Sequence, residues 1–154
     1  VDRDQVVMFR QILQRHTHKS EFDVSALSAL PRVDVVMVYQ GATGDVIKSL
    51  VDLGAKGIVV AGAGAGATAG SQNEGLDYAA EKGVFIVTAT RTGAGRIAPN
   101  RGPGGATLTP AQQRRRAFSV SAEDHIPVKA RILLMLTLSK TSDRDEIQRI
   151  FSEY

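Results

Sequence analysis

The sequence predicts an α/β domain, a Rossmann-like or flavodoxin-like three-layer fold in which a parallel sheet of about four strands is flanked by about four helices. Two observations predict it. Three short apolar runs rich in β-branched residues, at 33–39, 57–61 and 84–89, are typical of strands covered on both faces. Helical patterns separate these runs, and such spacing requires parallel pairing through right-handed crossovers.

Composition agrees with one compact main domain. The 154 residues are 43% hydrophobic with a net charge of +3, which is enough apolar material for a core of ordinary size. The 15 glycines cluster at the ends of apolar runs, where turns need them. The absence of cysteine excludes a disulfide framework and a thiolate metal site. The longest apolar run, Ile132 to Leu136, is far shorter than the roughly 20 residues that a membrane-spanning helix needs.

The chain begins before this domain. Residues 1–15 alternate apolar and polar positions, which indicates the remnant of a β-hairpin belonging to an N-terminal domain. Residues 16–31 are polar with a few apolar anchors and predict an interdomain linker. The α/β domain is expected over 32–154. The start carries no initiator Met and no signal-peptide pattern, so we expect a cut within a longer protein. Cellular location stays open, with a secreted or periplasmic site favoured over a cytoplasmic one.

Two helices are predicted between the three strands. Thr43 is expected to cap the first, and Gly54 to end it. Ser71, followed three residues later by Glu74, has the pattern of a capping box for a second helix that reaches Gly83. These helices connect consecutive parallel strands.

A basic segment follows the third strand. Residues 91–116 hold six arginines, no acid, and many glycines and prolines. A nucleic-acid surface is the less favoured interpretation, because no aromatic residue occurs before Phe118 to stack on a base. The segment predicts a solvated, mobile loop, followed by a short fourth strand at 118–120.

Two helices complete the domain. Pro127 suits the first turn of a helix over 128–138, whose apolar composition predicts that it is largely buried. Ser142 with Asp145 predicts a capping box for the last helix. One face of that helix is apolar: Ile147, Ile150, Phe151 and Tyr154.

Ligands of open parallel sheets bind beyond the carboxyl ends of the strands. The tract after the second strand, Gly62-x-Gly64-x-x-Ala67, matches a permissive dinucleotide fingerprint, and Arg91 would suit the 2′-phosphate of NADP. However, the next helix is predicted to begin several residues beyond the glycines, whereas a pyrophosphate needs the helix N-terminus within the motif. A nucleotide-binding module is therefore the alternative interpretation, and no cofactor is expected.

The sequence offers no clear arrangement of catalytic residues for hydrolysis. His16, His18 and His125 have no i, i+4 spacing for a metal pair, and we expect no metal site. No G-x-S-x-G nucleophile elbow is present. The residues alone predict an α/β domain with a ligand-facing edge.

Five stretches, in the same order along the chain, resemble the C-terminal part of bacterial-type and fungal L-asparaginases. The similarity runs from about residue 12 to the end. The stretches are HTHKSEFDVS at 16–25, LPRVDVV at 30–36, AKGIVVAG at 55–62, PVKARILL at 127–134 and DEIQRIF at 145–151.

This resemblance implies a two-domain amidohydrolase that converts asparagine, and often glutamine, to the acid and ammonia. It implies that the threonine nucleophile and its Thr-Lys-Asp partner group belong to an N-terminal domain, so that this chain holds no catalytic residue. It also implies a homo-oligomer built from intimate dimers, with a small amide as ligand and neither nucleic acid nor membrane as partner.

In that family the loop after the second strand sends an Asn into the partner's substrate site. By residue order this Asn corresponds to Ala67, and the one two places earlier corresponds to Ala65. The acidic residue of the following loop has no counterpart, because no Asp or Glu occurs between residues 91 and 122. Both departures put the recognition of the substrate's α-amino group in question.

Two explanations remain open for these departures. In the first, the protein is an asparaginase of altered geometry, and nearby polar residues make the missing polar contacts with the substrate: Thr68, Ser71, Gln72 or Glu74. Alternatively, the protein is a divergent amidase, or an interaction domain that keeps only the fold. We favour the first, and predict that the substrate pocket is lined by Gly66, Ala67, Thr68 and Ser71.

Overall fold

The structure, a computed structural model, describes residues 12–99 and 108–154. The predicted hairpin remnant at 1–15 lies almost wholly outside this range, and residues 12–15 form no strand. The stretch 16–31 contains a single short element, the 3-10 turn η1 (Thr17–Lys19). No helix in the described part of the chain is long and apolar enough to cross a bilayer.

Four strands form one parallel sheet in sequence order. They are β1 (Val33–Met37), β2 (Gly57–Gly62), β3 (Phe85–Thr90) and β4 (Ser119–Ser121). The sheet order is β1-β2-β3-β4, with Val33 opposite Gly57, Gly57 opposite Phe85 and Ile86 opposite Ser119. The predicted parallel sheet of four strands is confirmed.

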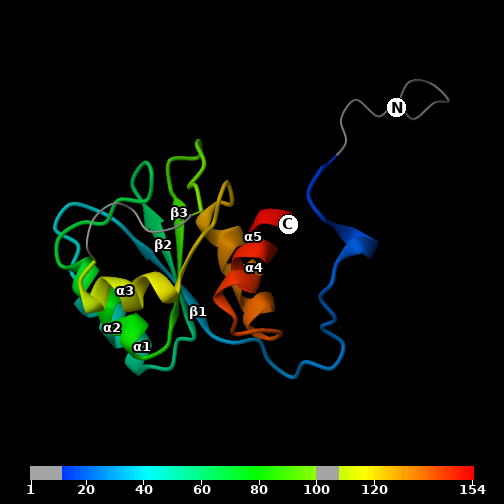
Figure 1. Cartoon of the computed structure of the whole chain (residues 1–154), viewed down its shortest axis with the longest axis horizontal. Coiled ribbons are helices and arrows are strands. Elements are labelled where there is room, and N and C mark those ends of the chain that lie inside the picture. Colours follow the sequence, from blue (N-terminus) through cyan, green and yellow to red (C-terminus); the bar gives the residue numbers. More distant parts are fainter. Residues whose placement is uncertain (1–11, 100–107) are drawn as a thin grey trace.

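Helices cover both faces of this sheet (Figure 1). One face carries α1 (Asp45–Asp52), α2 (Gln72–Glu81) and α3 (Pro110–Ala117). The other carries α4 (Pro127–Leu138) and α5 (Arg144–Glu153). The three-layer fold class is confirmed, with α3 as a helix that the sequence analysis missed.

Two apolar clusters, one on each side of the sheet, hold the layers together. Because side chains alternate along a strand, Ile58 packs with Ile47 on the α1 and α2 side, while Val59 packs with Leu134 and Phe151 on the α4 and α5 side. Each fully buried side chain of this size contributes about 1.5–3 kcal/mol. The sheet therefore supplies a rigid edge from which the connecting loops project.

The prediction that β1 is covered on both faces is wrong. Val33 and Val36 are buried, but the exposed fractions of Val35 and Met37 are 36% and 56%. β1 lies at the edge of the sheet, so α4 covers only the beginning of its outer face. The prediction that α4 is largely buried holds for its inner side, where Ala130, Leu133 and Leu134 are buried, whereas Val128 and Ile132 on its outer side are exposed.

Helix α3 occupies part of the segment predicted as a mobile loop. It begins with a capping box in which Thr109 Oγ1 accepts from the Gln112 amide and Thr109 N donates to the Gln112 side chain, followed by Pro110. Arg115 then binds α2 through Asn73 Oδ1 at 2.8 Å and Asp77 at 3.3 Å. Three arginines in the last turn also suit the negative end of the helix dipole.

The other helix starts differ from their predictions in detail. The residue before α1 is Gly44, without a side-chain cap, and not Thr43. Ser71 precedes α2 but makes no capping bond, so its predicted capping box is wrong. Asp143, not Ser142, caps α5 by accepting from the Glu146 amide at 2.8 Å. The predicted ends are confirmed, because Gly54 and Gly83 take positive φ values.

Candidate functional site

The candidate site lies at the carboxyl edge of the sheet, where the loop 62–71 leaves β2. Positive φ values at Gly64, Gly66 and Gly70 bend this loop sharply. A Cβ on Gly66 would overlap Cγ2 of Thr88 and lie 3.0 Å from Cδ1 of Ile97. The loop therefore lies flat on the end of β3, and only glycine fits at that contact.

A compact turn closes the loop on itself. Ala63 and Ala67 form an antiparallel bridge, and the amides of both Gly66 and Ala67 donate to Ala63 O at 3.1 Å. These amides are thus committed within the turn. Because α2 begins only at Gln72, no helix N-terminus opens within the glycine motif, so the geometry disfavours the dinucleotide interpretation.

Thr68 and Ser71 are partly buried and hydrogen-bonded within the fold. Thr68 Oγ1 donates to Asn73 Oδ1 at 3.0 Å, and Arg115 also donates to that oxygen. Ser71 Oγ accepts from the amide of Gly44 at 3.0 Å, which ties the loop to the start of α1. Both hydroxyls hold the loop in shape on its α1 and α2 side.

Gln72 is buried, with an exposed fraction of 1%. Its Nε2 donates to Met37 O and its Oε1 accepts from the amide of Ala69, both at 3.1 Å. The side chain thus fastens the loop to the end of β1. Gln72 was expected only as a possible substrate contact, because nothing in the local pattern distinguishes a buried Gln from an exposed one in a first helical turn.

The segment after β3 is fixed by Glu123, which the sequence analysis also missed. Its carboxylate accepts from Arg96 Nε at 2.8 Å and from the hydroxyl of Ser152, and Ile97 N donates to its backbone oxygen at 2.9 Å. Its side chain is almost fully buried, and its φ of +54° is unusual for a residue other than glycine. Such strain persists only where surrounding contacts hold it, as these do.

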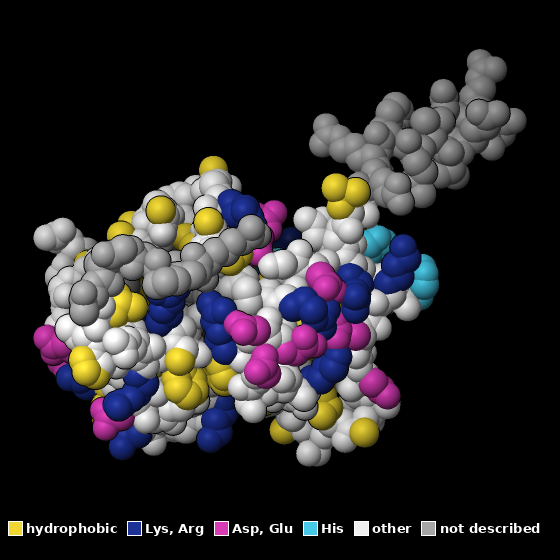
Figure 2. All heavy atoms as spheres, viewed as in Figure 1, with side chains coloured by type: hydrophobic (Ala, Val, Ile, Leu, Met, Phe, Trp, Pro, Cys, Tyr) yellow, Lys and Arg dark blue, Asp and Glu magenta, His cyan; other side chains and the backbone are white. Residues whose placement is uncertain are grey.

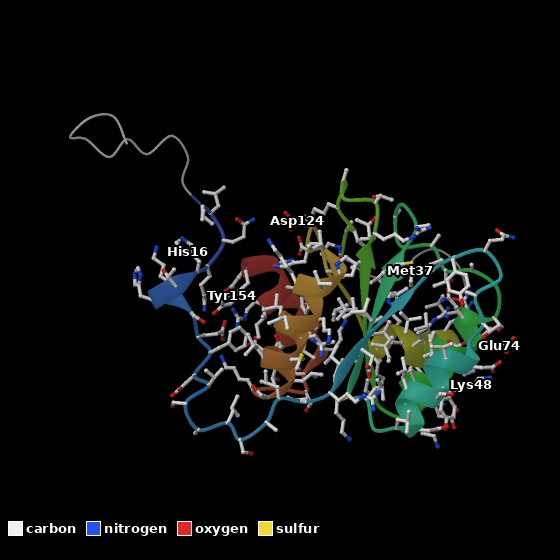
Figure 3. All side chains as sticks on the ribbon, turned by 180° about the vertical axis from the view of Figure 1, so that it is seen from behind. His16, Met37, Lys48, Glu74, Asp124 and Tyr154 are labelled. Atoms are coloured by element: carbon white, nitrogen blue, oxygen red, sulfur yellow. The ribbon has the colours of Figure 1, made fainter. Side chains whose placement is uncertain are left out.

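A hollow of about 480 Å³ lies between these two loops, beside the turn at Gly66. Its walls include Ala65, Gly66, Thr88, Arg96, Ser121 and Arg144. Of the predicted pocket residues only Gly66 borders this hollow, whereas Thr68 bonds toward α2 and Ser71 toward α1. Glu74, the other polar residue considered, lies on α2, and Figure 3 shows it on the opposite side of the sheet from Tyr154. Two guanidinium groups border the hollow, and both are paired within the fold, Arg96 with Glu123 and Arg144 with Asp145.

The described residues show no complete nucleophile arrangement at this edge. Within 12–99 and 108–154, hydroxyl and imidazole groups meet only in the linker, where Thr17 Oγ1 lies 3.3 Å from His16 Nδ1 and 3.4 Å from His18 Nδ1. That contact is exposed, and no carboxylate in the described part of the chain orients either ring. The same part of the chain contains no cluster of three His, Cys, Asp or Glu residues able to hold a metal ion.

Comparison with known proteins identifies relatives for most of this chain. The Glutaminase/Asparaginase C-terminal domain family matches residues 32–151. L-asparaginase 2 of Bacillus subtilis (strain 168) is 38% identical over 151 residues, which cover 98% of this chain and 37% of that protein. Glutaminase-asparaginase of Pseudomonas fluorescens biotype A is 36% identical over 147 residues, covering 95% and 38%.

A solved structure shares both fold and sequence. The "Probable Cytoplasmic L-asparaginase from Campylobacter jejuni" superposes with a TM-score of 0.83 at 38% identity, covering all of this chain and 47% of that one. The chain thus spans less than half of the length of each of these relatives. Sequence, fold and the order of elements agree, and we conclude that this chain belongs to the glutaminase/asparaginase family, whose C-terminal domain it represents.

Proposed function

We propose that the longer protein containing this segment is an L-asparaginase-type amidohydrolase, which hydrolyses the side-chain amide of asparagine, and of glutamine, to the acid and ammonia. Support comes from the family match over 32–151 and from relatives named L-asparaginase and glutaminase-asparaginase. The reaction requires an activated nucleophile and hydrogen-bond donors for the oxyanion.

Within that protein this domain forms walls of the substrate site and does not perform the covalent step. The observation that carries this proposal is the ordered turn at Gly66, which is bent onto the sheet edge and has no hydroxyl–imidazole pair beside it among the residues that the structure describes. The catalytic threonine would then belong to a preceding N-terminal domain. Residues 1–15 would be the end of that domain, 16–31 the linker, and 32–154 the present module.

The pocket is proposed to be lined by Gly66, Ala67, Thr68 and Ser71. The contacts of Thr68 with Asn73 and of Ser71 with Gly44 support an indirect contribution, in which each hydroxyl holds the loop where the substrate can meet its backbone. Loss of either bond should change the position of the loop. Its effect should therefore appear in substrate binding before it appears in the chemical step.

Kinetics of the full-length protein test this assignment. Thr68→Val and Ser71→Ala are expected to raise KM for asparagine by about tenfold, which corresponds to about 1.4 kcal/mol of lost binding. Ser142→Ala, which changes an exposed serine outside the loop, serves as the control and should leave KM unchanged. Unchanged KM in both loop variants would remove these residues from the pocket.

A separate experiment tests whether the nucleophile lies outside this domain. The 154-residue chain should release no ammonia from asparagine, because the proposed nucleophile lies elsewhere. Turnover by this chain at an enzymatic rate would contradict the proposal. The resemblance also supports a homo-oligomeric assembly of the full-length protein, which sedimentation velocity can measure directly.

A further inference from the structure

Ile97 is the residue through which the segment after β3 contacts the turn at Gly66. A Cβ built on Gly66 would lie 3.0 Å from Cδ1 of Ile97, and Ile97 is only 9% exposed. The turn is closed from within by the amides of Gly66 and Ala67, which both donate to Ala63 O. The position of Ile97 therefore limits how far this turn can move away from the end of β3.

The backbone of Ile97 is held on both sides by the segment that joins β4 to α4. Its amide donates to Glu123 O at 2.9 Å, and its carbonyl oxygen accepts from the hydroxyl of Ser121. The same hydroxyl accepts from the amide of Glu123 at 2.9 Å. Because Ser121 and Glu123 are both buried, Ile97 is fixed by residues that are themselves fixed in the fold.

The side chain of Glu123 holds the residue next to Ile97. One carboxylate oxygen accepts from Nε of Arg96 at 2.8 Å and also from its Nη2, while the other accepts from the hydroxyl of Ser152 on α5. The Glu123 side chain is 10% exposed and that of Arg96 is 53% exposed. A carboxylate that receives two bonds from one guanidinium group fixes its orientation. Glu123 thus joins α5 to the segment 96–97.

The backbone of Glu123 adopts a conformation that suits glycine better. Its φ is +54°, a left-handed value that a residue with a Cβ adopts at a cost and glycine adopts freely. Stability of the backbone alone would therefore favour glycine at this position. Strained residues are found where a fixed geometry serves function. What glycine could not provide is the carboxylate that binds Arg96 and Ser152.

We propose that Glu123 is a positioning residue for the amide hydrolysis proposed above. Through Arg96 and Ile97 it keeps the turn at Gly66 in place as a wall of the substrate pocket. This inference rests on the proposed function. Glu123 itself does not touch the substrate, because both of its carboxylate oxygens are bonded within the fold. Its loss should weaken substrate binding and leave the chemical step, whose nucleophile is proposed to lie elsewhere, nearly unchanged.

Two variants of the full-length protein separate positioning from stability. Glu123→Gln keeps the strained backbone and loses the ion pair, whereas Glu123→Gly relieves the strain and loses the same side-chain contacts. Both should raise KM for asparagine about tenfold and change kcat by less than about twofold. The melting temperature should be lower in Glu123→Gln but not in Glu123→Gly, where the relieved backbone offsets the lost contacts.

The neighbouring carboxylate supplies the matched control. Asp124 lies at the same end of the sheet (Figure 3), and its side chain is 66% exposed. Asp124→Asn removes a negative charge one residue away without removing a described contact to Arg96. KM should be unchanged. An equal rise of KM in Asp124→Asn and Glu123→Gln would assign the effect to charge at this edge and would overturn the positioning role.

Hydrogen exchange in the full-length protein gives a readout that does not depend on activity. In Glu123→Gly, peptides that cover 62–70 should exchange about tenfold faster than in the unchanged protein, and peptides that cover α1 should exchange equally slowly in both. Unchanged exchange over 62–70 would overturn the proposal, as would a KM that rises only in the variant with the lower melting temperature. If the unchanged protein hydrolyses no asparagine, the proposed function fails, and the exchange over 62–70 alone decides whether Glu123 holds the turn.

Discussion

Both carboxylate oxygens of Glu21 lie 2.9 Å from Nη2 of Arg149, a residue 128 positions later in the chain. Lys140 and Arg15 also bind this carboxylate, and the Glu21 amide donates to the Tyr154 hydroxyl at 2.6 Å. Phe22 packs against the Tyr154 ring, with centroids 5.2 Å apart. These contacts fasten the linker to α5, where Figure 2 shows charges of both signs side by side.

Glu21→Gln should release the linker from α5 without unfolding the domain. The amide cannot pair with three cations, so we expect a loss of about 1 kcal/mol in the free energy of unfolding, at the upper end for partly exposed ion pairs. Urea denaturation measures it, and faster proteolysis within 12–31 should accompany it. Glu81→Gln, at an exposed position on α2, is the control. An unchanged cleavage rate would show that apolar contacts alone hold the linker.

The same carboxylate predicts a dependence of stability on pH. Hydrogen bonding from Lys140 and Arg149 lowers the pKa of Glu21 below its ordinary value of 4.5, and Arg149 lowers the pKa of Glu146 likewise. A group whose pKa is lower in the folded state binds its proton more readily when unfolded. Its stabilisation is therefore complete above pH 4.5 and is lost as pH falls through the folded pKa.

Melting temperature measured between pH 7 and acid conditions should show this loss. The decline should begin near pH 4.5, the ordinary pKa of Glu21, and should be shallower in Glu21→Gln. Curves of equal slope for the two proteins would mean that other carboxylates control the acid transition.

Gly66→Ala should disturb the candidate site directly. The residue has a φ of +91°, and an added Cβ would overlap the Thr88 side chain. We expect a loss of about 1–3 kcal/mol in unfolding free energy from the combined strain and overpacking. Gly95→Ala is the matched control, since Gly95 has a φ of +90° but no atom within 4 Å of the added Cβ. Equal losses in the two variants would show that φ alone, and not the contact with Thr88, decides the cost.

Gln72→Met should weaken the attachment of the glycine-rich loop to β1. The substitution keeps the length of the side chain but leaves Met37 O and the Ala69 amide without their present partner. Such a loss costs about 1–3 kcal/mol, measurable by urea denaturation. Gln113→Met on α3, at an exposed position, should cost much less. A fully stable Gln72→Met protein would indicate that water replaces both bonds.

The strands and the order of layers could be predicted because they depend on local composition. The runs at 57–61 and 84–89 are almost wholly apolar, and each is a buried strand in the structure. Helix α3 was not predicted, because the arginine-, glycine- and proline-rich composition of 91–116 was taken to indicate a loop. The capping-box pattern of Thr109 and Gln112 in the same segment does indicate a helix start. The caps at Thr43 and Ser71 were predicted wrongly because a hydroxyl at a helix start can bond elsewhere, as Ser71 does with Gly44.

The candidate site was located by topology but not in its details. The rule that parallel strands end at one edge identified the loop 62–71, and Gly66 does lie against a hollow there. The roles of Gln72 and Glu123 could not be predicted, because their partners, Met37 for one and Arg96 and Ser152 for the other, come from distant parts of the chain.

By itself, the sequence determined the α/β class, the parallel order of the strands and the family to which the chain belongs, since these follow from local hydrophobic patterns and short motifs. Only the tertiary structure decided which side chains are covered. Val35 and Val59 are the same residue type in equivalent strand positions, yet one is exposed and the other fully buried. The difference arises because β1 is an edge strand and α4 passes over the middle of the sheet, and burial depends on neighbours that no local pattern encodes.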